Sequence, residues 1–360
     1  IIRGGVGVDN IDVKYAEANG ITVKNTPKAS SQSVAELAMG HMFSCARYLS
    51  IAGHTMREGK WEKKAYGKGI ELKGKTLGIV GESGCGKSTL GRTIIRIYDP
   101  TEGRILLDGR DISGKSTKRF RQELARSIQM IFQDPYACLN PRMTVTDLIA
   151  EGWDLNSAIH LSKQERREMA VELLHKVGLN EEHANRFAHE FSGGQRQRIG
   201  IARALSMSPA LMICDEPISA LDVSIQAQVM NLLLNLQREA GLSYIFIAHD
   251  LSMVRYISDS VAVMYLGSVV EYADNKELYE HPLHPYTQAL FSAIPVANPK
   301  VEKQRRRIKL EGEIPSPIHA LKGCNFCTRC RYVKPECFER APTLREVAPG
   351  HKVACHIVQN

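Results

Sequence analysis

The residues best suited to chemistry follow a short apolar stretch, "TLGIVG", in the order Gly81, four residues, Gly86, Lys87 and Ser88. Glycines let successive backbone N–H groups turn toward one phosphate, and a helix that begins here adds the positive end of its dipole. A lysine at this position reaches the β- and γ-phosphates of a nucleotide, and the serine hydroxyl ligates Mg²⁺. The spacing predicts a phosphate-binding loop. A glycine turn with one exposed lysine is the alternative.

Two acidic residues, Asp215 and Glu216, follow a second apolar stretch, "ALMIC". At a strand end, an aspartate can hold Mg²⁺ through water, and a glutamate can polarise an attacking water molecule. Two solvated acids after a core strand are the alternative interpretation.

Three more polar residues stand at the boundaries of elements. Ser192 begins a helix in "EFSGGQRQRIGIARAL", as either a plain N-cap or a phosphate ligand. His249 ends the strand "IFIAH", where a γ-phosphate contact competes with an ordinary turn histidine. Gln133 follows the strand "MIF", where a surface amide is the alternative to a functional side chain.

The elements that must position these residues alternate between strand and helix from Gly74 to about Ala273. A polar, helix-rich stretch covers about 143–190, and the tail from about 276 is punctuated by Pro and Cys. A chain of 360 residues that is 43% hydrophobic can bury two cores. The predicted fold class is therefore α/β, with more than one domain.

Composition excludes some classes of protein and leaves others open. No apolar run approaches the roughly 18 residues of a membrane span. The start, "IIRGGVGVDN", lacks the pattern of a signal peptide and a Met, so we expect it to lie inside a longer reading frame. The net charge of +8 permits an anionic partner. The basic run 305–309 is a solvated linker or a contact with a membrane leaflet, and no nucleic-acid motif accompanies it.

Taken in order, six motifs resemble the ABC transporter ATPase family. They are Walker A at Gly81–Thr89, the Q-loop at Gln133, the signature "FSGGQ" at 191–195, Walker B at 211–216, the D-loop "SALD" at 219–222, and the H-loop at His249. The resemblance covers about 74–360 and implies a P-loop NTPase core with a helical subdomain at about 136–190. It also implies that two ATPases pair head to tail, each signature closing over the γ-phosphate of the other.

The same resemblance implies a role for each matching residue. Glu216 would be the general base, and His249 would align the base with the γ-phosphate. Asp222 would bridge the subunits. Mg²⁺ would be served by Ser88, Gln133 and Asp215. ATP would contact Gly81, Ser83, Gly84, Cys85, Gly86, Lys87, Ser88, Thr89 and Gln133, and the second ATP would contact Ser192, Gly193, Gly194 and Gln195.

The tail contains "YEHPLHPYTQALFSAIP" and five of the nine cysteines. Without a secretory signal, such a cluster favours metal over disulfides. The segment resembles the C-terminal motif of oligopeptide/dipeptide importer ATPases, and this implies a [4Fe–4S] cluster on Cys324, Cys330, Cys337 and Cys355. Four thiolates suit iron–sulfur or zinc equally, and unligated thiols are a third possibility. Cys327, outside the family spacing, is either a substitute ligand or a bystander.

The first 80 or so residues resemble D-isomer-specific 2-hydroxyacid dehydrogenases, phosphoglycerate dehydrogenase in particular, through "GGVGVDNIDVKYAEANGITVKNTP" and "SVAELAMG". The G-x-G-x-x-G loop that should follow is absent, so we expect a truncated α/β fragment without activity at 1–73. It stands where ABC ATPases carry an aromatic residue that stacks on adenine. Trp61 or Tyr66 is a candidate substitute, with ordinary packing as the alternative, and reduced adenine affinity is expected. The join is a fusion or a product of sequence assembly.

These interpretations predict an ATP-hydrolysing subunit of a peptide importer, with an ABC ATPase domain at 74–275 and a C-terminal extension at 276–360. ATP and Mg²⁺ are the expected cofactors. The expected partners are a second ATPase, identical or a paralogue, two permease subunits on whose cytoplasmic face the chain docks, and an extracytoplasmic peptide-binding protein. The alternatives are an ABC ATPase that acts on nucleic acid or ribosomes, a dehydrogenase, and a non-catalytic interaction module.

Overall fold

The computed structural model describes the chain in segments that fall into two compact units. One unit holds the described residues of 81–113 and of the chain from 262 onward, and the other holds 74–80 and the described residues of 114–261. The described segments are 2–3, 24–25, 74–114, 117–156, 159–295, 307–312, 314–315 and 321–358. The predicted dehydrogenase-like fragment, with Trp61 and Tyr66, lies outside the described segments, except for β1 (Ile2–Arg3) and β2 (Lys24–Asn25), which pair in parallel.

The second unit is built on four parallel strands. Their order is β3-β8-β7-β6, with bounds β3 Thr76–Val80, β8 Ser243–Ile247, β7 Leu211–Asp215 and β6 Ile128–Ile131. These strands are apolar and almost wholly buried, the pattern typical of a parallel sheet covered on both faces. Because the strands are parallel, the carboxyl ends of β6, β7 and β8 lie at one edge. Gln133, Glu216 and His249 follow those ends closely.

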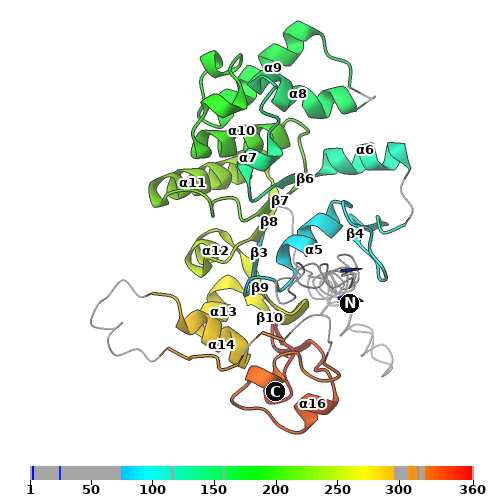
Figure 1. Ribbon diagram of the computed structural model, residues 1–360, viewed down its shortest axis with the longest axis vertical. Coiled ribbons are helices and arrows are strands. Elements are labelled where there is room, and N and C mark those ends of the chain that lie inside the picture. The colour runs from blue at the N-terminus through cyan, green and yellow to red at the C-terminus, as the bar shows by residue number, and fades with distance from the viewer. Residues whose placement is uncertain are drawn as a thin grey trace, which may run out of the picture. The chain divides into compact units, whose positions relative to one another are not determined.

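Helices complete this unit, and Figure 1 shows α8, α9 and α10 gathered together. Their bounds are α6 Lys118–Ser127, α7 Pro135–Cys138, α8 Val145–Leu155, α9 Lys163–Lys176, α10 Gly193–Leu205, α11 Val223–Ala240 and α12 Leu251–Ile257, with 3₁₀ turns at Glu181–His183 and Ala188–Glu190. Trp153 on α8 is 2% exposed, and its indole N–H donates to the carbonyl of Ser206 at 2.8 Å. This bond joins α8 to the end of α10 while the ring fills the core between them.

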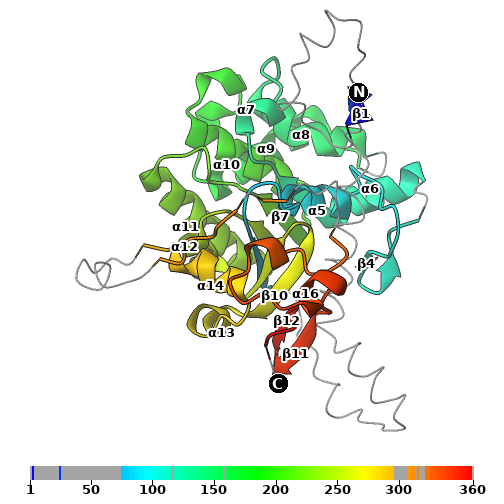
Figure 2. The same ribbon diagram turned by 60° about the horizontal axis from the view of Figure 1, so that its bottom comes forward.

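The first unit contains the loop after β3, its helix, and a sheet that the C-terminal tail completes. Strand β10 lies between β9 and β12, and β12 pairs antiparallel with both β10 and β11. Figure 2 shows β10, β12 and β11 succeeding one another. The bounds are α5 Lys87–Ile94, β4 Leu106–Leu107, β5 Arg110–Asp111, β9 Ser260–Tyr265 (from Ala262 in this unit), β10 Ser268–Asp274, α13 Asn275–Glu280, α14 Pro285–Ser292, a 3₁₀ turn Cys327–Arg329, α16 Glu336–Glu339, β11 Arg345–Ala348 and β12 His351–Val353.

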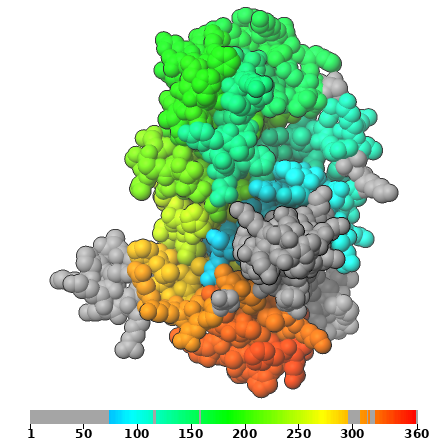
Figure 3. Space-filling model, in the orientation of Figure 1, coloured from blue at the N-terminus to red at the C-terminus, as the bar shows by residue number. Residues whose placement is uncertain are grey.

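The C-terminal residues belong to the packed body of this unit. Figure 3 shows the surface of the residues coloured orange to red as one continuous mass. Three large aromatic side chains from separate elements, Tyr265, Tyr286 and Phe326, are almost fully buried together, with ring centroids 4.7 to 5.5 Å apart. Aromatic contacts of this kind stabilise a fold beyond the area that they bury.

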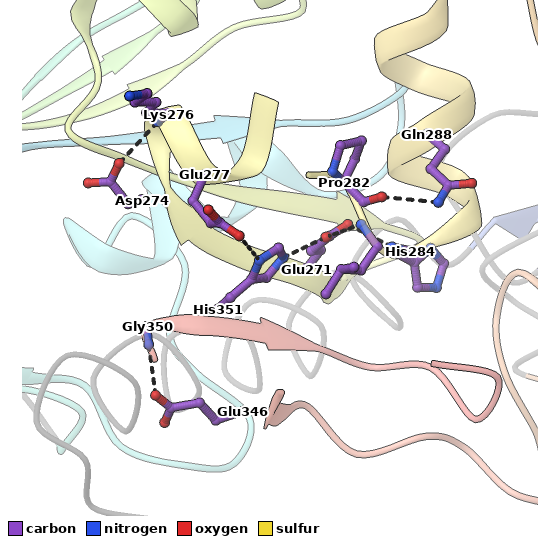
Figure 4. A network of polar contacts seen from close by, with 11 residues as sticks. Glu271, Asp274, Lys276, Glu277, Pro282, His284, Gln288, Glu346, Gly350 and His351 are labelled. Carbon is purple, nitrogen blue, oxygen red and sulfur yellow. Dashed lines mark hydrogen bonds and ion pairs between the residues drawn. The ribbon is translucent and has the colours of Figure 1, made fainter. Parts of the chain in front are cut away.

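A buried polar network also holds the tail to the sheet (Figure 4). His351 on β12 contacts Glu271 on β10 through Nε2 at 2.8 Å and Glu277 on α13 through Nδ1 at 3.3 Å. Glu271 also accepts the backbone N–H groups of Leu283 and His284. Each buried charge therefore has partners, which is the condition under which burying it is tolerated.

Across the described segments, we find no helix with the length and hydrophobicity that crossing a bilayer requires.

Candidate nucleotide site

The loop between β3 and α5 depends on glycine at three positions. A Cβ on Gly81 would come within 2.2 Å of the Met264 carbonyl oxygen and 2.8 Å of the Cys85 sulfur. Gly84 and Gly86 have φ angles of 79° and 98°, in the left-handed region that side chains disfavour. The predicted spacing of glycines therefore corresponds to a loop that other residues could form only with strain.

Lys87 lies inside the curve of this loop and is only 5% exposed. Its ammonium donates to the carbonyls of Gly81 at 2.8 Å and Glu82 at 3.0 Å, and lies 3.6 Å from the Cys85 sulfur. Burial raises the pKa of the Cys85 thiol, although the charge of Lys87 opposes the shift. The exposed-lysine alternative is therefore wrong, because the charge is held at the centre of the loop.

The remaining loop residues have the exposure that a ligand contact requires. Ser83 and Gly84 are exposed, and Ser88 and Thr89 are partly exposed on the first turn of α5. Gly86 precedes the helix as its N-cap, so the positive end of the α5 dipole lies at the loop. This combination of backbone dipole and buried ammonium suits an anion with several phosphates.

In the other unit, Glu216 has an unusual backbone conformation directly after β7. Its φ of 47° places a non-glycine residue in the left-handed region. Its N–H donates to the carbonyl of Ile247 at 2.9 Å, and its carbonyl accepts from the N–H and the hydroxyl of Ser219. Such conformations cost about 1–3 kcal/mol and persist where the surroundings hold them, commonly at functional sites.

The side chain of Glu216 meets two of the predicted residues. The Gln133 amide donates to Oε2 at 2.7 Å, and Nδ1 of His249 lies 3.4 Å from the same oxygen. The Glu216 side chain is 16% exposed, whereas that of His249 is 59% exposed. The side chains of Gln133 and His249, which follow the two strands on either side of β7, thus meet at the Glu216 carboxylate and can orient it.

Asp215, the last residue of β7, is fully buried opposite Ile247 of β8. Burial, and secondarily the charge of Asp215, raise the pKa of the neighbouring Cys214 thiol. The alternative of two solvated acids is therefore wrong. One acid is buried and the other is held by partners.

The signature segment forms the start of α10. Ser192 is exposed and caps the helix: its hydroxyl accepts from the N–H of Gln195 at 3.4 Å, and the Gln195 side chain accepts from the N–H of Ser192 at 3.0 Å. A Cβ on Gly194 would meet the Ile225 side chain at 2.4 Å, so this glycine allows α10 to approach α11 closely. Ser192 is therefore the N-cap of α10, and its exposed position is also compatible with a contact to a ligand.

Asp222 caps α11. Its Oδ1 accepts from the Ser224 hydroxyl at 2.7 Å and the Ile225 N–H at 3.1 Å, and these bonds, that from Ser224 first, lower its pKa. The residue is exposed on the surface and remains ionised at neutral pH.

The cysteines predicted as cluster ligands lie in one small region. The Cys324 N–H donates to the Cys337 carbonyl at 2.7 Å. Burial first, and then the nearby thiols of Cys355, Cys327 and Cys337, together raise the pKa of Cys324 to about 12. Within the described residues, no group of three or more His, Cys, Asp or Glu side chains is arranged to hold a metal ion. The site does not fit a [4Fe–4S] cluster, and that prediction is not supported.

The fold and the loop define an ATP-binding cassette of the ABC transporter class. The ABC transporter family model matches residues 72–219. The solved structure of cbiO1 from Clostridium perfringens, part of the ABC transporter complex cbiONQ, is 32% identical with a TM-score of 0.52, covering 59% of this chain and 82% of that one. The dimeric structure of MJ0796, a bacterial ABC transporter cassette, is 29% identical with a TM-score of 0.52, covering 57% and 88%.

Similarity over a longer part of the chain shows which kind of ABC transporter ATPase it is. The model for the C-terminal region of oligopeptide/dipeptide transporters matches residues 270–337. The oligopeptide transport ATP-binding protein AppF of Bacillus subtilis is 57% identical over 285 residues, 79% of this chain and 86% of AppF. OppF of Escherichia coli is 54% identical over 282 residues, covering 78% and 84%. The chain belongs to this family, the ATP-binding, ATP-hydrolysing subunits of oligopeptide/dipeptide ABC importers.

Sequence reasoning did not find two features of the site. Ser219 was placed only in the D-loop motif, yet it fixes the Glu216 carbonyl through two bonds. Glu82 is one of the four residues that the loop motif leaves unspecified. Its partners Tyr286 and Arg329 are 204 and 247 residues away in the sequence. The only signal in the sequence was that an acid stood in a loop suited to anions.

Proposed function

We propose that ATP is held by the loop from Gly81 to Thr89 and that Glu216 activates the water that hydrolyses it. The observation that carries this proposal is the Glu216 carboxylate, which is oriented by the Gln133 amide at 2.7 Å and the His249 ring at 3.4 Å. A base whose geometry is fixed in advance needs less reorganisation during the reaction.

Each part of the loop has a distinct task in this proposal. The buried Lys87 ammonium offsets charge on the β- and γ-phosphates, and the backbone N–H groups from Ser83 to Thr89 bind phosphate oxygens. We propose that Ser88, Gln133 and Asp215 serve Mg²⁺, because each carries an oxygen of the hard type that this ion prefers. The ion would supply charge neutralisation along the phosphates.

At the carboxylate, the chain's own residues handle the proton. Glu216 Oε2 accepts the Gln133 amide and contacts His249, and we propose that the other oxygen, Oε1, takes the proton of the attacking water. His249 then aligns the base with the terminal phosphate. Its high exposure leaves it accessible to a ligand.

The function also requires partners. We infer that Ser192, Gly193, Gly194 and Gln195 contact the nucleotide of a second ATPase, identical or a paralogue, and that Asp222 bridges the two. The exposure of Ser192 and Asp222 and a dimeric relative support this inference. Relatives named as oligopeptide transport ATP-binding proteins support a complex with permease subunits. We propose that two permeases bind the chain at the cytoplasmic membrane face and that an extracytoplasmic peptide-binding protein supplies them.

The proposal assigns the ABC ATPase domain to 74–275, with a helical subdomain at about 136–190, and the extension to 276–360. It leaves 1–73 without a catalytic role. It also routes no step through the cysteines, because their arrangement does not fit a metal ion.

The test uses the full chain reconstituted with its membrane subunits and binding protein in liposomes. We expect ATP-dependent uptake of a labelled oligopeptide together with release of inorganic phosphate. An amino acid or a sugar offered as cargo should give no uptake. Phosphate release without peptide uptake would contradict the importer function, and failure to bind ATP would contradict the proposed site.

A further inference from the structure

The phosphate-binding loop carries a negative charge of its own at Glu82, and the C-terminal tail neutralises it. Nη1 of Arg329 lies 2.7 Å from Glu82 Oε2, and Nη2 lies 3.2 Å from Oε1. The Arg329 side chain is 7% exposed and that of Glu82 is 26% exposed. This is a two-point pair with little solvent around it, the strong form of a charged hydrogen bond.

The same region holds the backbone of Glu82. Its N–H donates to the hydroxyl of the buried Tyr286 at 2.8 Å. The Tyr265 hydroxyl lies 3.3 Å from Nη1 of Arg329, which fixes the guanidinium from a second side. Both the side chain and the main chain of Glu82 are therefore set by residues from beyond 262.

Glu82 is in turn linked to the ammonium that would meet phosphate. Its carbonyl accepts from Lys87 at 3.0 Å, beside the carbonyl of Gly81 at 2.8 Å. A displacement of Glu82 therefore displaces an acceptor of the Lys87 ammonium. An unpaired carboxylate here would also repel the phosphates, because like charges in a partly buried site are poorly screened.

Arg329 is placed by the cysteine-rich segment. It ends the 3₁₀ turn Cys327–Arg329, and its N–H donates to the carbonyl of Phe326 at 3.0 Å. Phe326 is buried against Tyr265 and Tyr286. The packing of this turn thus decides where the guanidinium lies.

We propose that Arg329 is a positioning residue for the phosphate-binding loop, through which the C-terminal segment 321–358 sets the affinity of the loop for nucleoside triphosphate. It acts by cancelling the charge of Glu82 and by fixing the carbonyl that holds Lys87. The inference rests on the proposed function, because it assumes that this loop binds ATP.

The test is a double-mutant cycle on the full chain, read as the dissociation constant for ATP in a fluorescence titration. Arg329→Gln leaves Glu82 unpaired and should weaken ATP binding about tenfold, or about 1.4 kcal/mol. Glu82→Gln leaves the arginine beside the loop and should bind ATP at least as tightly as the unmodified chain. The double variant should recover to within about threefold, because neither charge remains.

A purely structural role would give a different pattern, since the double variant would then be as weak as Arg329→Gln or weaker. That result, or wild-type affinity in Arg329→Gln, would overturn the proposal. Arg331→Gln is the matched control: it removes the same charge from an exposed neighbour that stacks on Tyr332, and ATP affinity should not change.

If Arg329→Gln does not fold, the titration is made with Arg329→Lys instead. It keeps the charge but loses the two-point geometry, and it should weaken ATP binding about threefold. Unchanged affinity in that variant would overturn the proposal. Absence of ATP binding in the unmodified chain would instead contradict the proposed function.

Discussion

The loop after β3 and the carboxylate after β7 are held in place in different ways. In the loop, Lys87 bonds to carbonyls five and six residues earlier, so the backbone itself supplies the partners. Glu216 is oriented by side chains from distant parts of the chain, Gln133 and His249. The comparison indicates that the lysine of the loop is held by neighbours in the sequence, whereas the orientation of the carboxylate depends on tertiary structure.

The largest expected effect is a loss of ATP hydrolysis without a loss of ATP binding. Glu216→Gln should lower ATPase turnover by at least about 100-fold, because the base and its charge are lost. ATP affinity should change little, since the loop is intact. Phosphate release by the reconstituted transporter measures the effect. The control Glu239→Gln neutralises an exposed acid near the end of α11 and should retain turnover within about twofold.

The next effect is on binding at the loop. Lys87→Met should weaken ATP binding about 30-fold, because hydrogen bonds to a charged group contribute about 1.5–3 kcal/mol. A titration with fluorescent ATP measures it. Lys163→Met, on the exposed first turn of α9, is the control and should bind as the unmodified chain does. Equal affinities for all three proteins would refute the role of the loop.

A smaller effect tests the side chains around the carboxylate. His249→Gln should lower turnover about tenfold with a modest change in ATP affinity, because the residue orients a base and supplies no proton transfer of its own. Steady-state kinetics give kcat and KM separately. An increase in KM with unchanged kcat would show that His249 only binds nucleotide.

The last effect concerns the stability of the unit that contains the loop and not its activity. Burial disfavours protonated His351, but the hydrogen bonds and charges of Glu271 and Glu277 outweigh it and raise the pKa of His351 above 6.5. The folded state therefore gains stability that is complete below about pH 6.5 and is lost as pH rises through the folded pKa.

His351→Gln should remove this pH dependence and cost about 1–3 kcal/mol at pH 6. Denaturant unfolding of both proteins at pH 6 and pH 8 checks it. His281→Gln, at an exposed position, serves as the control. A wild-type stability that rises between these pH values relative to the variant would contradict the assignment.

The sequence predicted the loop well because its constraints are local. Gly81, Gly86 and Lys87 are separated by fixed spacings, and the structure places them in the predicted loop. The order of the motifs along the chain predicted that Glu216, His249 and Gln133 belong to the site. Their mutual contacts and the left-handed backbone of Glu216 depend on the pairing of β7 with β6 and β8, which periodicity alone does not specify.

The tail was the hardest region to predict. The cysteine cluster favoured a metal site, but within the described residues no group of three or more His, Cys, Asp or Glu side chains is arranged to hold a metal ion. The pair of Arg329 with Glu82 joins residues 247 positions apart, and it depends on tertiary packing such as that of Tyr265, Tyr286 and Phe326.

The central claim is that binding and hydrolysis are assigned to different residues, and one experiment on two variants tests it directly. Bound nucleotide and released phosphate are measured in the same reconstituted samples of Lys87→Met and Glu216→Gln. We predict that Glu216→Gln retains bound ATP but releases almost no phosphate, and that Lys87→Met loses most of both. The account would be contradicted if Glu216→Gln released phosphate at the rate of the unmodified chain, or if both variants lost ATP binding equally.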